Sequence, residues 1–77
     1  MTVNVGIVGT FDVQNFGDLL FPIIAEHELR KRFGDVVVHP FSYHAKTAPD
    51  WPYDVASVAD LPERIADLDA LLIDAGF

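Results

Sequence analysis

The amino-acid sequence predicts an α/β fold in which a three-stranded parallel sheet is flanked by helices. Three observations predict it: three short apolar runs, a long amphipathic segment between the first two, and glycine residues where the first run and that segment end. Strands that alternate with helical segments are typical of right-handed β-α-β units, whose strands share one sheet. The 77 residues allow one small domain, which we expect to span residues 1–77.

The first expected strand runs from Val3 to Gly9. Its sequence, Val-Asn-Val-Gly-Ile-Val-Gly, is rich in β-branched residues and ends on glycine, as in a parallel strand that is covered on both faces. Residues 10–18 mix turn-forming residues with aromatic residues and show no sustained period, which predicts a loop.

A helix is expected from Leu19 to Phe33. Asp18 is its expected N-cap, Pro22 then lies near the first turn, and Gly34 is expected to end the helix. Apolar residues recur at every fourth position and predict one buried stripe: Phe21, Ala25, Leu29 and Phe33, with Leu20 and Ile24 alongside.

The second expected strand covers residues 35–42, where Pro40 favours a position at the sheet edge or at the strand end. Residues 43–58 are polar and rich in turn formers, and we expect a loop that is long for a compact domain. Within it, Trp51 and Tyr53 either stack on a sugar or pack over the sheet edge, and packing is the favoured interpretation.

The chain is expected to finish with a short helix over residues 61–66, capped by Asp60, and a third buried strand over residues 68–74. We expect the first strand in the middle of the sheet and helices on both faces. This arrangement is an incomplete Rossmann-like, doubly wound half-domain.

Composition excludes several classes of function. The formal charge of −7, with only five Lys and Arg residues, argues against nucleic acid as a partner. There is no cysteine, and the three histidines are irregularly spaced, so we expect no metal. The N-terminus has no basic leader and no apolar run approaches roughly 20 residues, so we expect no transmembrane segment and a cytoplasmic location.

The loop after the first strand is the expected binding site, because ligands of open parallel sheets bind beyond the carboxyl ends of the strands. Its glycine spacing matches neither the dinucleotide nor the P-loop pattern, so we expect no nucleotide cofactor. The candidate substrate-binding residues are Thr10, Asp12, Asn15, Gly17, Asp18 and Tyr43. For Asp18 an ordinary helix cap, and for Asn15 a turn-forming side chain, remain alternatives. No catalytic residue is assigned.

The segment Gly9-Thr10-Phe11-Asp12-Val13-Gln14-Asn15-Phe16-Gly17-Asp18-Leu19-Leu20 resembles the first glycine-to-helix segment of the polysaccharide pyruvyl transferase family, whose members show N-x-G-D here. The resemblance continues through residues 41–43, 49–53 and 70–73. One difference follows the third strand, where the family usually has Gly-Gly-Gly and this chain has Asp74-Ala75-Gly76-Phe77.

The resemblance implies transfer of a pyruvyl group from phosphoenolpyruvate to a sugar hydroxyl of a cell-surface polysaccharide in bacteria. It implies that this segment contributes the acceptor side of a two-domain protein, that phosphoenolpyruvate is held by the other domain, and that the 77 residues are inactive alone. The alternative is a small interaction module that keeps the fold and covers its open sheet edge by self-association or with a partner. A nucleotide-binding module rests on fold analogy alone and ranks last.

Overall fold

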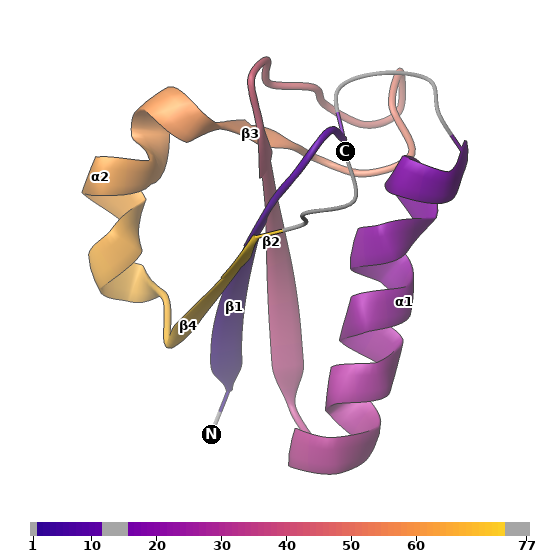
Figure 1. The fold of residues 1–77 in the computed structure, drawn as a ribbon, viewed down its shortest axis with the longest axis vertical. Coiled ribbons are helices and arrows are strands. Elements are labelled where there is room, and N and C mark those ends of the chain that lie inside the picture. Colours follow the sequence, from indigo (N-terminus) through magenta and orange to yellow (C-terminus); the bar gives the residue numbers. More distant parts are fainter. Residues whose placement is uncertain (1, 12–15, 74–77) are drawn as a thin grey trace.

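The computed structural model describes residues 2–11 and 16–73, which form one four-stranded parallel sheet with helices on its two faces (Figure 1). The strands lie in the order β3-β2-β1-β4. No helix in these ranges is both long and apolar enough to cross a membrane. The elements are β1 (Val3–Val8), α1 (Phe16–Phe33), β2 (Val36–Ser42), β3 (Ala56–Ser57), the 3-10 turn η1 (Val58–Asp60), α2 (Leu61–Arg64), the 3-10 turn η2 (Ile65–Asp67) and β4 (Ala70–Ile73).

The predicted α/β class is confirmed, and so is the interior position of the first strand, but the predicted number of strands is wrong. The additional strand, β3, has only two residues and lies within the segment 43–58 that was expected to be a loop. It pairs in parallel with the last two residues of β2. A two-residue strand has no alternation that a sequence pattern could show, and only its pairing with β2 defines it.

Helix α1 begins at Phe16, earlier than the predicted start at Leu19. Asp18 is therefore a first-turn residue rather than the N-cap, and Pro22 lies inside the helix. The predicted end is confirmed: Gly34 has a φ of 84°, and its N–H donates to the carbonyl of Arg30 at 3.0 Å. This left-handed conformation after a helix is the one that glycine adopts without steric cost.

Helix α1 covers one face of the sheet and encloses the core. Val5, Ile7 and Val36 form that core together with Phe11 and Val55. The helix contributes most of the predicted stripe, which packs against this cluster with Phe21, Ala25 and Leu29. The fourth predicted member, Phe33, is exposed, because it lies in the last turn, where the chain leaves the sheet face for Gly34. Leu20 and Ile24, which were expected alongside the stripe, are exposed as well.

The segment that contains α2 crosses the opposite face of the sheet (Figure 1). Gly6 permits this approach, since a Cβ atom there would lie 2.7 Å from Cδ1 of Leu68. Asp60 occupies the predicted N-cap position of α2, but its side chain makes no capping hydrogen bond. Ser57 caps the preceding turn η1 instead, accepting from the N–H of Ala59 at 3.2 Å.

Strand β4 lies at one edge of the sheet, beside β1, and all four of its residues are exposed. The prediction of a buried third strand is therefore wrong for this structure. The register pairs Gly6 with Leu71 and Ile7 with Leu72. In the part of the chain that the structure describes, β1 is the only strand beside β4, and neither helix encloses its side chains.

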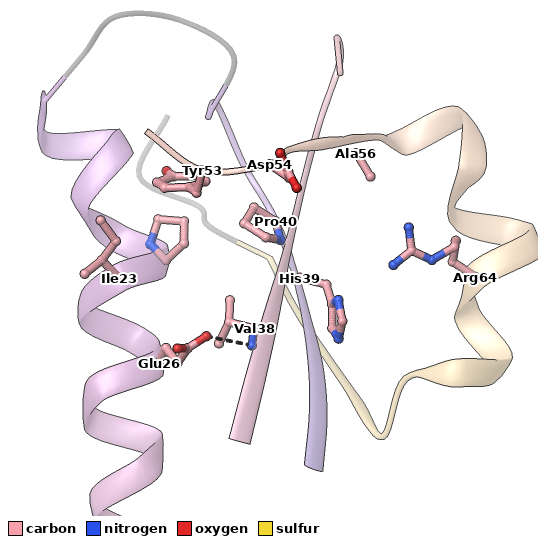
Figure 2. A pocket seen from close by; sticks show the side chains of 10 residues that line it. Ile23, Glu26, Val38, His39, Pro40, Tyr53, Asp54, Ala56 and Arg64 are labelled. Atoms are coloured by element: carbon pink, nitrogen blue, oxygen red, sulfur yellow. Dashed lines mark hydrogen bonds between the residues drawn. The ribbon is translucent and has the colours of Figure 1, made fainter. Parts of the chain in front are cut away.

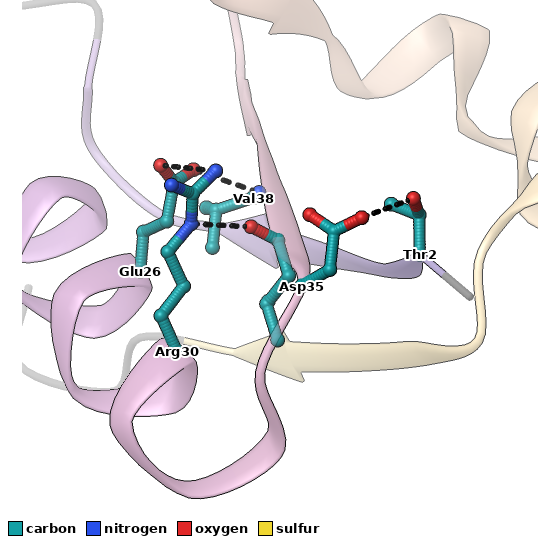
Figure 3. Close-up of polar contacts among 6 residues, drawn as sticks. Thr2, Glu26, Arg30, Asp35 and Val38 are labelled. Atoms are coloured by element: carbon teal, nitrogen blue, oxygen red, sulfur yellow. Dashed lines mark hydrogen bonds and ion pairs between the residues drawn. The ribbon is translucent and has the colours of Figure 1, made fainter.

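On the other side of the sheet, the outer edge of β2 is covered by side chains of α1 (Figure 3). Because β3 pairs only with Phe41 and Ser42, the preceding residues of β2 have no strand on their outer side. Side chains of α1 occupy that place: Arg30 Nε donates to the carbonyl of Val36 at 2.8 Å, and Glu26 accepts from the N–H of Val38 at 3.0 Å.

Candidate functional site

The expected binding loop follows β1, at the sheet edge formed by the carboxyl ends of the strands. From β1 the chain passes through α1 to β2 on one side, and it later returns through α2 to β4 on the other side. The strand order therefore reverses between β1 and β4. In open parallel sheets this reversal leaves a crevice in which ligands bind.

Ser42, at the end of β2, fixes the beginning of this loop. Its buried hydroxyl accepts from the N–H of Phe11 at 2.6 Å and donates to the carbonyl of Gly9. The N–H of Gly9 donates in turn to the carbonyl of Phe41 at 3.1 Å. The backbone after β1 is thus tied to β2, and Phe11 is directed into the core. Sequence reasoning missed this role of Ser42, because a serine at a strand end has no characteristic spacing.

The structure brings two of the predicted site residues together. Thr10 Oγ1 donates to Asp18 Oδ2 at 3.1 Å, and both residues are partly buried. Asp18 belongs to the first turn of α1, where the helix dipole favours a negative charge. The hydrogen bond and the helix together hold one carboxylate beside the carboxyl end of β1.

Two further predicted residues, Gly17 and Tyr43, are exposed. Gly17 is exposed in the first turn of α1. Tyr43 follows β2 with 82% of its surface exposed, and its ring lies 5.7 Å from the ring of His44. No contact joins Tyr43 to the Thr10–Asp18 pair among the described residues. Asp12 and Asn15 lie outside the residues that the structure describes.

The aromatic residues of the long loop pack within the fold, but against the core rather than over the sheet edge where they were expected. Trp51 Nε1 donates to the carbonyl of Phe11 at 2.8 Å, and Tyr53 Oη donates to the carbonyl of Leu19 at 2.7 Å. Burial raises the pKa of the Tyr53 phenol to about 12. Lys46 Nζ lies 5.1 Å from the centroid of the Trp51 ring.

Two cavities lie near this loop. One, of about 630 Å³, is mostly apolar and lies between the start of α1 and the segment 49–52. The other, of about 530 Å³, carries more polar side chains and lies along the outer edge of β2 (Figure 2). Neither of these two cavities is lined by Thr10 or Asp18.

The geometry suits recognition of a hydroxyl group. Among the described residues only Thr10 donates to the carboxylate of Asp18, whose other lone pairs can accept from a hydroxyl group. Within residues 2–11 and 16–73, no three His, Asp or Glu side chains gather in a way that would hold a metal ion. Comparison of the chain with protein-family models, with curated proteins and with solved structures finds no match.

Proposed function

We propose that this chain is the acceptor-side part of an enzyme that transfers a pyruvyl group from phosphoenolpyruvate to a sugar. In this reaction two sugar hydroxyls add to C2 of phosphoenolpyruvate, the methylene carbon gains a proton, and phosphate leaves, so that a ketal is formed. The chain folds as a Rossmann-like half-domain and supplies the surface that receives the sugar.

The observation that carries this proposal is the hydrogen bond between Thr10 and Asp18 at the carboxyl end of β1. It supports the proposal because these residues belong to the segment that resembles the pyruvyl transferase family, and because they flank the point where the strand order reverses. The carboxylate of Asp18 accepts a hydrogen bond from a sugar hydroxyl, and Thr10 holds that carboxylate in one orientation.

The experiment is a ¹H–¹⁵N NMR titration of the chain with the methyl glycosides of glucose, galactose and mannose. The expected result is a saturable shift of the amides of Thr10, Gly17 and Asp18 with at least one of them. Asp18→Ala removes the acceptor and is expected to weaken binding at least about tenfold, the effect of losing a charged hydrogen-bond partner.

Asp50→Asn is the matched control, because it removes an exposed carboxylate from another loop. It is expected to leave the affinity unchanged. Equal affinities of the Asp18→Ala variant and the unchanged chain would remove the loop from the site, and so would the absence of any saturable shift near Thr10.

A second function, that of an interaction module, is favoured by the exposed apolar strand β4. Unpaired edge strands bind other strands, and charge or proline normally prevents this pairing. Light scattering during size-exclusion chromatography tests it. A dimer that Leu72→Glu dissociates supports the module, whereas a monomer over the whole concentration range rejects it.

A further inference from the structure

The cavity beside β2 is not lined by Thr10 or Asp18. It has a volume of about 530 Å³ and opens along the part of β2 that β3 does not cover. Figure 2 shows Ile23 and Glu26 of α1 on one side of β2 and Arg64 of α2 on the other. Side chains from both faces of the sheet therefore line one space.

This cavity is not a place for another strand. Pairing with the edge of β2 would require free N–H groups there. The N–H of Val38 already donates to Glu26 at 3.0 Å, and Pro40 has no N–H. The strand edge therefore offers an occupant no free N–H donor at either position.

Arg64 provides a positive charge at one end of the cavity. Its guanidinium lies 5.5 Å from the centroid of the Phe41 ring, which holds it by a cation–π contact. No carboxylate forms an ion pair with it in the part of the chain that the structure describes. A planar guanidinium with free N–H donors binds a carboxylate through two parallel hydrogen bonds.

Two residues that line the same cavity, Asp54 and His39, offer hydrogen-bond acceptors. Asp54 Oδ1 accepts from the N–H of Ala48 at 2.9 Å, and no described residue donates to its Oδ2. His39 Nε2 lies 3.0 Å from Asn4 Oδ1, an atom that can only accept. The imidazole is neutral at neutral pH, because burial and the charge of Arg64 lower its pKa below 6.5. Nε2 therefore carries the proton, and Nδ1 is an acceptor.

The charges of the cavity balance. Glu26 forms an ion pair with Arg30 at 3.6 Å, which leaves Arg64 and Asp54 as the two opposite charges. The apolar side chains of Ile23 and Pro40 complete the lining. One cation, two acceptors and an apolar wall suit a molecule with a carboxylate, several hydroxyl groups and exposed C–H groups.

We propose that this cavity binds a sugar acid. Its carboxylate pairs with the guanidinium of Arg64, its hydroxyls donate to Asp54 Oδ2 and to His39 Nδ1, and its carbon skeleton packs on Ile23 and Pro40. The site shares no residue with the Thr10–Asp18 pair and does not depend on the proposed transferase function.

The test is a ¹H–¹⁵N NMR titration with D-glucuronate. The matched probes are D-glucose, which has a similar ring but no carboxylate, and acetate, which has the carboxylate but no hydroxyls. We expect saturable chemical-shift changes around His39 and Arg64 with glucuronate. The affinities for the other two probes are expected to be at least about tenfold lower. No saturation by about 50 mM glucuronate overturns the proposal.

Two substitutions at Arg64 complete the test. Arg64→Gln removes the charge and is expected to lower the affinity for glucuronate at least about tenfold, whereas Arg64→Lys keeps the charge but not the paired donors and gives an intermediate affinity. Arg32→Gln removes an exposed charge elsewhere on α1 and is expected to change nothing. Equal affinity of the Arg64→Gln and Arg32→Gln variants overturns the proposal. Asp18→Ala, which tests the transferase function, is expected to leave glucuronate binding intact.

Discussion

The carboxylate of Glu26 accepts a hydrogen bond from the backbone N–H of Val38 at 3.0 Å, so that a helix side chain takes the place of a neighbouring strand (Figure 3). Arg30 completes the arrangement by donating to the carbonyl of Val36. Proteins protect exposed sheet edges with charged side chains and proline, and here Glu26, Arg30 and Pro40 act together on one edge.

Glu26→Ala is therefore expected to destabilise the fold by about 1–2 kcal/mol, because the N–H of Val38 loses its charged acceptor. Urea denaturation measures the change. Glu28→Ala is the matched control, since Glu28 forms only an exposed ion pair with Lys31 at 3.6 Å; its expected cost is below about 0.5 kcal/mol. Equal costs for both variants would show that the contact with Val38 contributes nothing to stability.

Ser42→Ala is expected to destabilise the fold by about 1–3 kcal/mol. The hydroxyl satisfies the N–H of Phe11 and the carbonyl of Gly9, and alanine would leave both groups without a partner in a buried place. Thr2→Ala, which removes an exposed hydrogen bond of 2.7 Å to Asp35, is the control and is expected to cost less than about 1 kcal/mol. If Ser42→Ala costs no more stability than Thr2→Ala within error, Ser42 does not anchor the backbone after β1.

Stability is expected to decrease as the pH falls through 6.5, because His39 is harder to protonate in the folded protein than in the unfolded chain. Burial is the main cause of its lowered pKa; the charge of Arg64 adds to it, and Glu26 partly opposes it. The unfolded state binds more protons in this range, so the free energy of unfolding rises with pH up to the unfolded pKa and is constant above it.

Denaturation measured between about pH 8 and about pH 5.5 tests this, with His39→Gln as the comparison. In the variant, the free energy of unfolding is expected to change less steeply with pH, because the contribution of His39 is absent. The same pH dependence in both proteins would mean that His39 has the same pKa in the folded and unfolded states.

At high pH, we expect Tyr53 to make the stability of the fold decrease as the pH rises. Its pKa of about 12 in the folded protein exceeds the ordinary value of 10.0, so the stability that the protonated phenol contributes is complete below pH 10.0 and is lost as the pH rises toward 12. Tyr53→Phe removes this loss and costs about 1 kcal/mol at neutral pH, because the hydrogen bond to Leu19 disappears. Absorbance titration of the phenol, with Tyr43→Phe as background, measures the pKa; a midpoint near 10 would contradict the burial.

The sequence by itself determined the α/β class, most of the apolar stripe that α1 packs against the core, and the helix stop at Gly34. These features follow from local periodicity and from backbone preferences, which act over a few neighbouring residues. The same local signals placed the start of α1 too late, because Asp18 suits a first-turn position as well as a cap.

Only the tertiary structure decided the relationships across the sheet. The hydroxyl of Ser42 meets the backbone after β1 across 31 residues of sequence, and Glu26 reaches Val38 only because α1 lies over that edge. Strand β4 shows the same limit: its apolar sequence predicts burial, yet its exposure depends on which elements stand beside it. Pairing and burial are properties of the assembled sheet, so no local pattern determines them.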